Sequence, residues 1–282
     1  MRRWIAATLT ASAVVVATPA FAYAAPADPV GALQKQFVEG RGVKVSETTR
    51  MTSDGQDTGA VSRMTGVLQF GKSGVVASDI TRRVKLDGAT KKIVASDEEG
   101  TESLAALFSP TRYITVKGKT YAKGGAFSQD LPEGKKWVSV EYAPEAGAGS
   151  SQVIDIFNKP LLKTLLKGAK SSKGGVYKGA ISVKDLTKAT SGTAVKGKLG
   201  KIKVEYQITV NGKQLITRVV SKLTLNFGLL GTMATTTDTR YSGWGAKVSV
   251  VAPPADQVID AKELGENAPE VPDLLNLNGS RD

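Results

Sequence analysis

Cysteine and histidine are both absent from this chain of 282 residues. Without them the protein has no thiol nucleophile, no imidazole general base and none of the ligands that most zinc sites use. No disulfide can form, so the fold must be held by core packing alone, which a chain of this length can supply. The missing cysteine also removes the residue through which a bacterial lipoprotein receives its lipid anchor.

Sequence signatures of catalysis are missing as well. Neither S-x-x-K nor G-x-S-x-G occurs, so the chain carries no signature of a penicillin-binding enzyme or an α/β-hydrolase. Residues 118–120 resemble the end of a phosphate-binding loop, but the first Gly of that motif would fall on Tyr113, and we interpret them as a hairpin turn. The acidic cluster 97–99 is typical of a solvated turn, and residues 54–57 lack the spacing of a calcium loop. We therefore predict a protein that is not an enzyme and uses no metal or cofactor.

The N-terminus has the pattern of a secretory signal. Two arginines at positions 2 and 3 precede an apolar stretch over residues 4–17, and small residues follow with two overlapping A-x-A patterns. The apolar stretch is too short to span a bilayer. We predict that residues 1–24 are a signal peptide, cleaved after Ala22 or Ala24, and that the mature protein is secreted or extracytoplasmic in the cell envelope without a lipid anchor.

Positive charge dominates the chain, with 38 Lys and Arg against 26 Asp and Glu and a formal net charge of +12. A basic surface attracts anionic polymers, acidic lipid headgroups or nucleic acid by the same Coulomb interaction. Nucleic acid is the weakest of these candidates, because the protein is exported and no stacking aromatic residues interleave with the basic ones. We predict no nucleic-acid partner and a possible peripheral contact with an anionic membrane.

Hydrophobic periodicity predicts a short helix followed by antiparallel sheet. Asp28 and Pro29 fit the cap and first position of a helix that continues to Val38. From there apolar residues alternate with a period of two between Gly-containing turns, which indicates strands with one buried face. The alternating positions in this half of the chain are Val43 and Val45; Met64, Leu68 and Phe70; Val76, Ile80 and Val84.

The second half of the chain predicts further strands around a helical insertion. We expect a hairpin over residues 113–122, a strand over 137–140, a helix over 153–157, opened by Ser150 or Ser151, and a second helix over 161–169. Later elements are a small helix near 185–186, a hairpin of 202–210 with 215–225 around Asn211-Gly212, and strands over 233–241 and 248–251. We predict one domain over residues 25–265 and a disordered tail over 266–282.

The order and spacing of several segments resemble the actinobacterial LppX/LprA/LprF/LprG envelope lipoproteins over residues 29–265. The segments are 116–123, 135–140, the leucine-rich helical pair, 241–245 and 250–254. The resemblance implies an α+β fold of the LolA/LolB type, a half-open antiparallel β-barrel of about eleven strands wrapped over short helices, with an apolar cavity for acyl chains. It supplies no catalytic motif, and this chain lacks the family's anchor cysteine.

Two functions are open at this point. The first is a secreted, non-enzymatic binding or carrier protein for a lipid or lipoglycan of the cell envelope; the second is a structural or regulatory module that binds a protein or an anionic wall polymer through its basic surface. The apolar residues could line a cavity or pack as an ordinary core, and the apolar loop 226–232 could fold back as core or contact a membrane. Candidates for the lipid cavity are Met64, Leu68, Phe70, Leu161, Leu165, Tyr206, Ile208, Leu223 and Leu225, and for membrane contact Phe227, Leu229 and Leu230.

Overall fold

The computed structural model describes residues 28–95, 108–128, 131–141 and 149–267. The predicted signal peptide, the acidic cluster 97–99 and the predicted tail from residue 268 onward lie outside these residues. The strands are β1 (Arg41–Ser53), β2 (Gln56–Phe70), β3 (Val75–Leu86), β4 (Thr111–Val116), β5 (Lys119–Gly124), β6 (Trp137–Val140), β7 (Val176–Ser182), β8 (Lys203–Val210), β9 (Ile216–Asn226), β10 (Thr232–Lys247) and β11 (Val258–Asp260). The helices are α1 (Pro29–Gln34), α2 (Gly88–Ala95), α4 (Lys159–Lys167), α5 (Val183–Ser191) and α6 (Gly197–Lys201), with 3-10 turns at Gly125–Ser128, Lys173–Gly175, Gly228–Leu230, Ala255–Gln257 and Ala261–Asn267.

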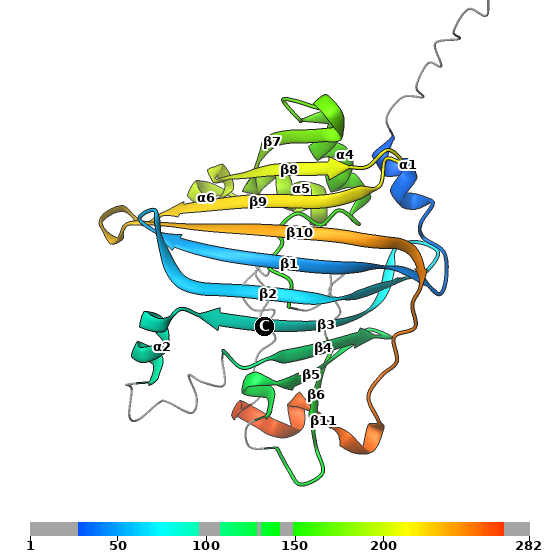
Figure 1. Ribbon diagram of the computed structural model, residues 1–282, viewed down its shortest axis with the longest axis vertical. Helices are drawn as coiled ribbons and strands as arrows, with labels where there is room; N and C mark the ends of the chain where they lie inside the picture. The colour runs from blue at the N-terminus through cyan, green and yellow to red at the C-terminus, as the bar shows by residue number, and fades with distance from the viewer. Residues whose placement is uncertain (1–27, 96–107, 129–130, 142–148, 268–282) are drawn as a thin grey trace, which may run out of the picture.

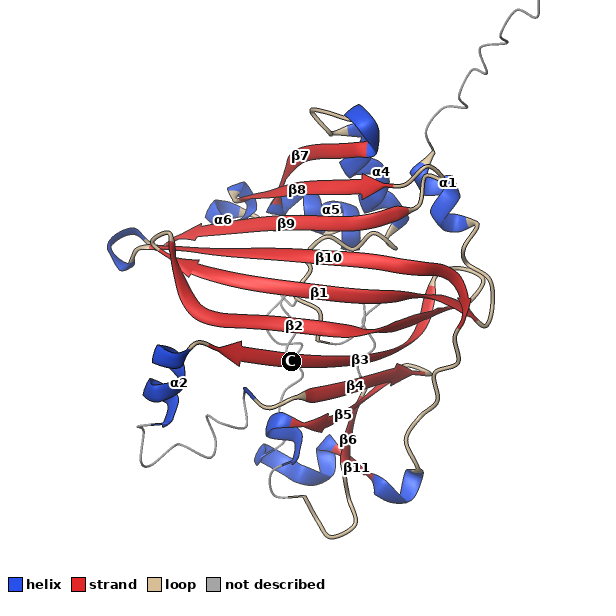
Figure 2. Ribbon diagram, viewed as in Figure 1, coloured by secondary structure: helices blue, strands red, loops and turns tan. Residues whose placement is uncertain are grey.

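All of these strands belong to one sheet, in the order β11-β6-β5-β4-β3-β2-β1-β10-β9-β8-β7 (Figure 1). Neighbouring strands are antiparallel except for β11, which runs parallel to β6. The terminal strands β7 and β11 lie at opposite edges, so the sheet is not closed. Helices α4, α5 and α6 lie behind β7 to β9, α1 lies near the ends of these strands, and α2 follows the end of β3 (Figure 2). The predicted α+β fold class, with a half-open and mostly antiparallel sheet of eleven strands over short helices, is confirmed.

The core lies between the sheet and the helices α1, α4 and α5. We call the face of the sheet that these helices cover the inner face. Asp28 caps α1 by accepting a hydrogen bond from the Gly31 backbone at 2.8 Å, and Pro29 occupies the first turn, as predicted. In α4, Pro160 stands in the first turn, where its missing N–H costs no helical hydrogen bond. The helices bury Leu33, Leu161, Leu162, Leu165 and Leu186 against inward residues of the sheet.

An aromatic cluster closes one end of this core. The Phe70 ring lies 5.4 Å from Phe37, 5.9 Å from Phe157 and 5.9 Å from Trp244, centroid to centroid. Trp244 also donates a hydrogen bond from its indole N–H to the Ile216 carbonyl at 2.9 Å, so its polar atom is satisfied. These rings join β2, β10 and the segment before α4 into one packed unit.

The predicted helix over 153–157 is wrong, because this segment is not helical. Side-chain oxygens take the backbone N–H groups that a helix would use: Gln152 Oε1 accepts from Ile154 at 3.1 Å, and Asp155 Oδ1 accepts from Phe157 at 2.8 Å. Such local bonds compete with helical ones. The segment nevertheless buries Ile154, Ile156 and Phe157 in the core.

Two strand predictions also need correction. Val76 was expected to point inward with Ile80, but half of its side-chain surface is exposed. Gln69 pairs with Ala77 and Phe70 with Val75, so Val76 is the extra residue of a β-bulge and its side chain leaves the alternation. The predicted strand 248–251 is not part of the sheet, since β10 ends at Lys247 and Val250 donates its N–H to the Gln69 side chain instead.

Candidate functional site

The inner face divides into three zones along the strands. One end, which we call the packed end, is buried under the helices and includes Val43, Val45, Leu68, Phe70 and Ile208. The other end, which we call the open end, carries apolar side chains that remain partly exposed. Between the two runs a band of hydrogen-bonded polar side chains, the polar belt.

The polar belt centres on Glu47, which points inward from β1 and is almost fully buried. Its carboxylate accepts hydrogen bonds from Ser150 Oγ at 2.8 Å, Ser151 N at 2.7 Å and Thr239 Oγ1 at 3.0 Å. Burial raises the pKa of the Glu47 carboxyl above its ordinary value, and these hydrogen bonds and the positive charge of Arg82 offset part of that rise. Glu47 therefore fixes the segment before α4 to the sheet at the centre of the inner face.

Threonine and glutamine side chains extend the belt across β1 and β10. Gln152 Nε2 donates to Thr239 Oγ1 at 3.0 Å, and Thr237 Oγ1 donates to the Ser151 carbonyl at 3.3 Å. Thr49 and Thr237 face each other across β1 and β10, and their hydroxyl oxygens are hydrogen-bonded at 3.3 Å. Because a buried polar group is costly unless it is paired, this network fixes the position of the segment 150–152 on the sheet.

The open end begins where the belt stops. Met51 lies opposite Thr235, which lies opposite Leu223, and one row further along the strands Met233 lies opposite Leu225. Met51 keeps 38% of its surface exposed, and the other three apolar side chains are of intermediate burial. The open end is therefore an accessible apolar surface, defined by Met51, Leu223, Leu225 and Met233.

The predicted cavity residues fall into two groups. Seven of them are almost completely buried and belong to the packed end or to the helices over it; Tyr206, for example, donates its hydroxyl to the Leu165 carbonyl at 2.6 Å and thereby ties β8 to α4. Leu223 and Leu225 instead belong to the open end. The seven buried residues are Met64, Leu68, Phe70, Leu161, Leu165, Tyr206 and Ile208.

The predicted membrane-contact loop joins β9 to β10 directly beyond the open end. Phe227 exposes half of its surface and Leu229 is fully exposed, so these two side chains do not fold back into the core. The side chain of Leu230 lies outside the described residues. The neighbouring β1–β2 hairpin holds the base of the loop: Asp54 donates its backbone N–H to the Thr232 carbonyl, and its carboxylate accepts from the Thr232 N–H, both at 2.7 Å.

The polar belt was not predicted from the sequence, although the sequence contains a signal for it. Glu47 follows Val43 and Val45 in phase, so an alternating strand places its charged side chain inside. Thr237 and Thr239 alternate in phase with Tyr241 in the sequence, and the structure buries all three on the inner face. What the sequence cannot show is that residues 150–152, a hundred positions away, bring the donors to Glu47.

Two pockets lie outside the inner face. One, of about 500 Å³, lies between α1 and α4 and is lined by Asp28, Gln34, Lys159, Lys163 and Tyr177 among others. The second, of about 490 Å³, lies on the outer face of β7 to β10 and carries Lys170, Lys178 and Lys222 with one acidic residue, Glu205. Within the described ranges no acidic cluster is suited to a metal ion, and no helix is long and apolar enough to cross a membrane.

Comparisons with known proteins give no family assignment. No family model matches the chain, and neither does any curated protein. Among solved structures, a hypothetical protein CT021 of Chlamydia trachomatis superposes with a TM-score of 0.27 at 11% identity, over 79% of this chain and 96% of that one. The LolA superfamily protein NE2245 of Nitrosomonas europaea gives 0.25 at 7% identity over 78% and 93%, and a putative outer membrane lipoprotein-sorting protein domain of Vibrio parahaemolyticus gives 0.24 at 7% over 76% and 89%.

Superpositions as loose as these carry no argument about function. The open sheet, the polar belt and the open end are features of this chain itself. The resemblance to the actinobacterial envelope lipoproteins stays a prediction.

Proposed function

We propose that the protein is an extracytoplasmic, non-enzymatic carrier that binds the acyl portion of a lipid or lipoglycan along the open end of its inner face. The observation that carries this proposal is the difference in burial along the inner face. Inward apolar residues are covered at the packed end, whereas Met51, Leu223, Leu225 and Met233 line a partly exposed surface. An inward-facing apolar surface that the protein's own core leaves accessible is typical of a ligand site.

The dimensions of the open end suit a hydrocarbon chain. Thr237 of the polar belt lies four positions after Met233 on β10, which at the rise of a strand gives about 13 Å. Covering an acyl chain over that distance removes methylene groups from water, each contributing about 0.8 kcal/mol. The side chains there include two methionines, whose flexible thioethers adapt to ligands of varied shape. The polar belt would limit how deep the chain enters, because its donors and acceptors are already paired.

Export is the second part of the proposal and rests on residues 1–24. An n-region, an apolar h-region and A-x-A patterns are a secretory arrangement. N-terminal sequencing of protein recovered outside the cytoplasm should give Tyr23 or Ala25 as the first residue. Recovery of extracytoplasmic protein that still begins at Met1 would contradict it.

A carrier function is tested by introducing charge at the open end. The purified protein is titrated with a fluorescent long-chain fatty acid, first as wild type and then with Leu225→Asp. An unpaired carboxylate among apolar groups is costly, so Leu225→Asp should weaken binding at least tenfold. Thr224→Asp is the matched control: it adds the same charge one position earlier, on the exposed outer side of β9, and should bind as wild type does. Equal binding by both variants would refute the site.

The outer pocket supports a second candidate, the binding of an anionic wall polymer. Lys170, Lys178 and Lys222 surround this pocket with only Glu205 to oppose them, which gives it an excess of positive charge. A Lys178→Gln, Lys222→Gln variant should then lose retention on a column of phosphate-rich wall polymer while still binding the fluorescent fatty acid. The reverse result, unchanged retention, would remove this candidate.

A further inference from the structure

One end of the sheet gathers several exposed apolar side chains. Among the described residues, the large hydrophobic side chains with the greatest exposure are Val38, Met51, Val76, Leu199, Phe227, Leu229 and Val251. Four of them lie at the end where the β9–β10 loop projects, whereas the three valines lie at the opposite end of the strands. The four are Met51, Leu199, Phe227 and Leu229.

The exposed residues Leu199 and Phe227 come from separate segments that the sheet brings to the same end. Helix α6 carries Leu199 and leads directly into β8, whose Val204 pairs with Leu223 of β9. Strand β9 ends at Asn226, three residues after Leu223, and the β9–β10 loop begins there with Phe227. Figure 1 shows α6 beside the start of β8 and the β9–β10 loop projecting beyond it at the left.

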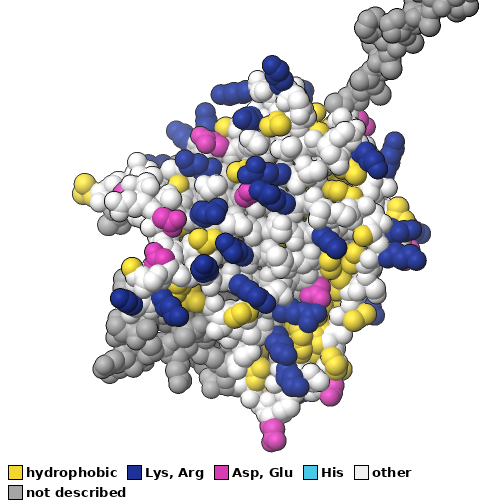
Figure 3. All heavy atoms as spheres, in the orientation of Figure 1, with side chains coloured by type: hydrophobic (Ala, Val, Ile, Leu, Met, Phe, Trp, Pro, Cys, Tyr) yellow, Lys and Arg dark blue, Asp and Glu magenta, His cyan; other side chains and the backbone are white. Residues whose placement is uncertain are grey.

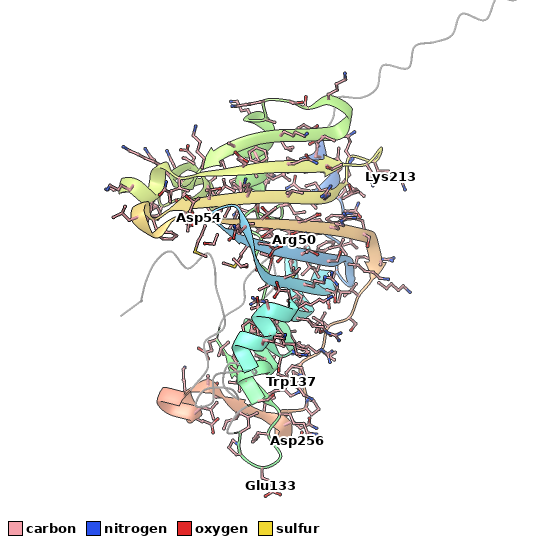
Figure 4. The ribbon with its side chains drawn as sticks, turned by 60° about the vertical axis from the view of Figure 1, so that its left-hand side comes forward. Arg50, Asp54, Glu133, Trp137, Lys213 and Asp256 are labelled. Atoms are coloured by element: carbon pink, nitrogen blue, oxygen red, sulfur yellow. The ribbon has the colours of Figure 1, made fainter. Side chains whose placement is uncertain are left out.

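The β9–β10 loop is held firmly enough to act as an anchor. Phe227 N donates to the Gly231 carbonyl at 2.9 Å, and Gly228 N donates to Asn226 Oδ1 at 2.8 Å. Gly231 has a φ of +88°, and a Cβ at this position would lie 2.5 Å from a carboxylate oxygen of Asp54, so only glycine fits. Figure 4 shows Asp54 at this end of the sheet and Lys213 at the other. The loop therefore presents its apolar side chains on a fixed base.

Basic residues surround these anchors. Lys196, Lys198, Lys201 and Lys203 are all exposed on or next to α6, and Lys222 is exposed on β9. None of these five lysines is in an ion pair with a described carboxylate. In the space-filling view, apolar side chains occupy the tip of the projecting hairpin and basic side chains the surface behind it (Figure 3).

We propose that α6 and the β9–β10 loop form one docking surface for an anionic lipid bilayer. The surface consists of Leu199, Phe227 and Leu229 as apolar anchors and the five lysines around α6 and on β9. Exposed apolar anchors combined with unpaired lysines fit a bilayer, because the anchors enter the acyl region and each lysine near an anionic surface adds attraction. A nucleic acid would supply negative charge but no apolar phase for fully exposed leucine.

Docking in this way would bring the open end to the membrane. Leu225 and Met233, the outermost pair of the open end, flank the β9–β10 loop directly. An acyl chain leaving the bilayer beside Phe227 would meet this pair first and then Met51 and Leu223. This part of the inference rests on the proposed carrier function, whereas bilayer binding itself does not.

Vesicle co-sedimentation tests the docking surface. The protein, recovered from the extracytoplasmic fraction, is mixed with vesicles of phosphatidylglycerol and phosphatidylcholine in equal amounts, and with vesicles of phosphatidylcholine alone. Wild type should bind the anionic vesicles more strongly than the neutral ones. A Phe227→Ser, Leu229→Ser variant should lower the partition coefficient at least tenfold, and Lys198→Gln, Lys201→Gln should lower it about tenfold on anionic vesicles only.

The opposite end of the strands provides the matched control. A Val76→Ser, Val251→Ser variant removes two exposed apolar side chains of the other end and should bind as wild type does. A tryptophan reporter gives a second measurement that needs no loss of function. On addition of anionic vesicles, the fluorescence of the tryptophan introduced by Leu229→Trp should shift to the blue and be quenched by brominated lipid. The fluorescence of the tryptophan introduced by Val251→Trp should do neither.

Three results of the vesicle experiment would overturn the docking surface. Failure of wild type to bind anionic vesicles, an unchanged partition coefficient in the folded Phe227→Ser, Leu229→Ser variant, or an equal loss in the Val76→Ser, Val251→Ser control would each overturn the docking surface. Docking and carriage are separated by the fatty-acid titration, because the docking variants leave the open end intact and should still bind the fluorescent fatty acid. Loss of fatty-acid binding in Leu225→Asp with normal vesicle binding would leave both assignments standing.

Discussion

The packed end and the open end of the inner face are built on the same long strands yet differ in what covers them. At the packed end, Phe70 and Ile208 are fully buried beneath α4 and the segment before it. At the open end, Met51 and Leu225 point to the same side of the sheet and remain partly exposed. Within the part of the chain that the structure describes, apolar side chains of the helices therefore cover the packed end of the sheet but not the open end.

Element lengths explain the difference. Strand β10 has 16 residues and spans about 53 Å, whereas α4 has 9 residues and spans about 13 Å. Among the described residues, α4 is too short to cover strands of this length, and the apolar side chains beyond the polar belt are more exposed than those under the helices. The comparison shows that inward-facing periodicity alone does not distinguish a core residue from a ligand-contacting one.

The largest effect on stability is expected from truncation at the packed end. Phe70→Ala removes a ring that contacts three other aromatic side chains and should lower the free energy of unfolding by about 3–5 kcal/mol. Urea denaturation measures this loss. Destabilisation below about 1 kcal/mol would mean that Phe70 does not belong to a tightly packed core and that the two ends do not differ as described.

A charge at the boundary of the open end should act on ligand binding more than on folding. Leu223→Asp places a carboxylate on a partly exposed inward position, so it should cost about 1–3 kcal/mol of stability and abolish binding of the fluorescent fatty acid. Circular dichroism and the titration are read together. A folded variant that binds as wild type does would place Leu223 outside the ligand site.

The polar belt should make stability depend on pH. Because burial raises the pKa of Glu47 above 4.5, the native state keeps the proton of this carboxyl up to a higher pH than the unfolded state does. The contribution of this group is therefore fully present below pH 4.5 and is lost as the pH rises through the raised native value. Glu47→Gln cannot titrate, so the stability difference between wild type and this variant should shrink as the pH rises through that window.

The same variant has a cost that does not depend on pH. The Gln amide replaces one acceptor oxygen with a donor, which leaves a hydrogen-bond donor of Ser150, Ser151 or Thr239 without its partner and costs about 1–3 kcal/mol. Urea denaturation at several pH values separates the two effects. A stability difference that is constant across the window would show that the pKa of Glu47 is the same in the native and unfolded states.

The smallest effect on stability is expected at the open end itself. Leu225→Ala removes a partly exposed side chain, so it should cost about 1 kcal/mol or less, well below the cost of truncation at the packed end. Binding of the fluorescent fatty acid should nevertheless weaken severalfold, because a lining group is lost. A stability loss as large as that of Phe70→Ala would show that the open end is ordinary core.

Much of the fold could be predicted because local patterns determine it. Asp28 and Pro29 predicted α1, and the alternation through Val204, Tyr206 and Ile208 predicted β8. Asn211-Gly212 predicted the following hairpin, although the observed turn is longer and places Gln214, not Gly212, at positive φ. The prediction of a helix over 153–157 was wrong. Side chains in this segment accept the backbone N–H groups that a helix would use, and apolar periodicity contains no information about such hydrogen bonds.

The candidate site was predictable only in part. Leu223 and Leu225 were identified as ligand contacts together with seven residues that belong to the packed core. Of the nine, those on strands share the inward phase, and Leu161 and Leu165 lie on the apolar face of α4. Separating them requires knowing where α4 lies along the strands, which is a long-range fact. The exposure of the β9–β10 loop was easier to predict from the sequence. Connections between strands are usually polar, so a connection that holds Phe and Leu beside glycines stands out.

Mass spectrometry of organic extracts tests the central claim most directly. The protein is purified without detergent from the extracytoplasmic fraction of cells that express it, alongside Leu225→Asp and the control Thr224→Asp. We predict that wild type and Thr224→Asp yield the same acyl lipid in near-equimolar amount and that Leu225→Asp yields little or none. Absence of bound lipid in wild type, or equal lipid in Leu225→Asp, would contradict the assignment of the open end as a lipid site.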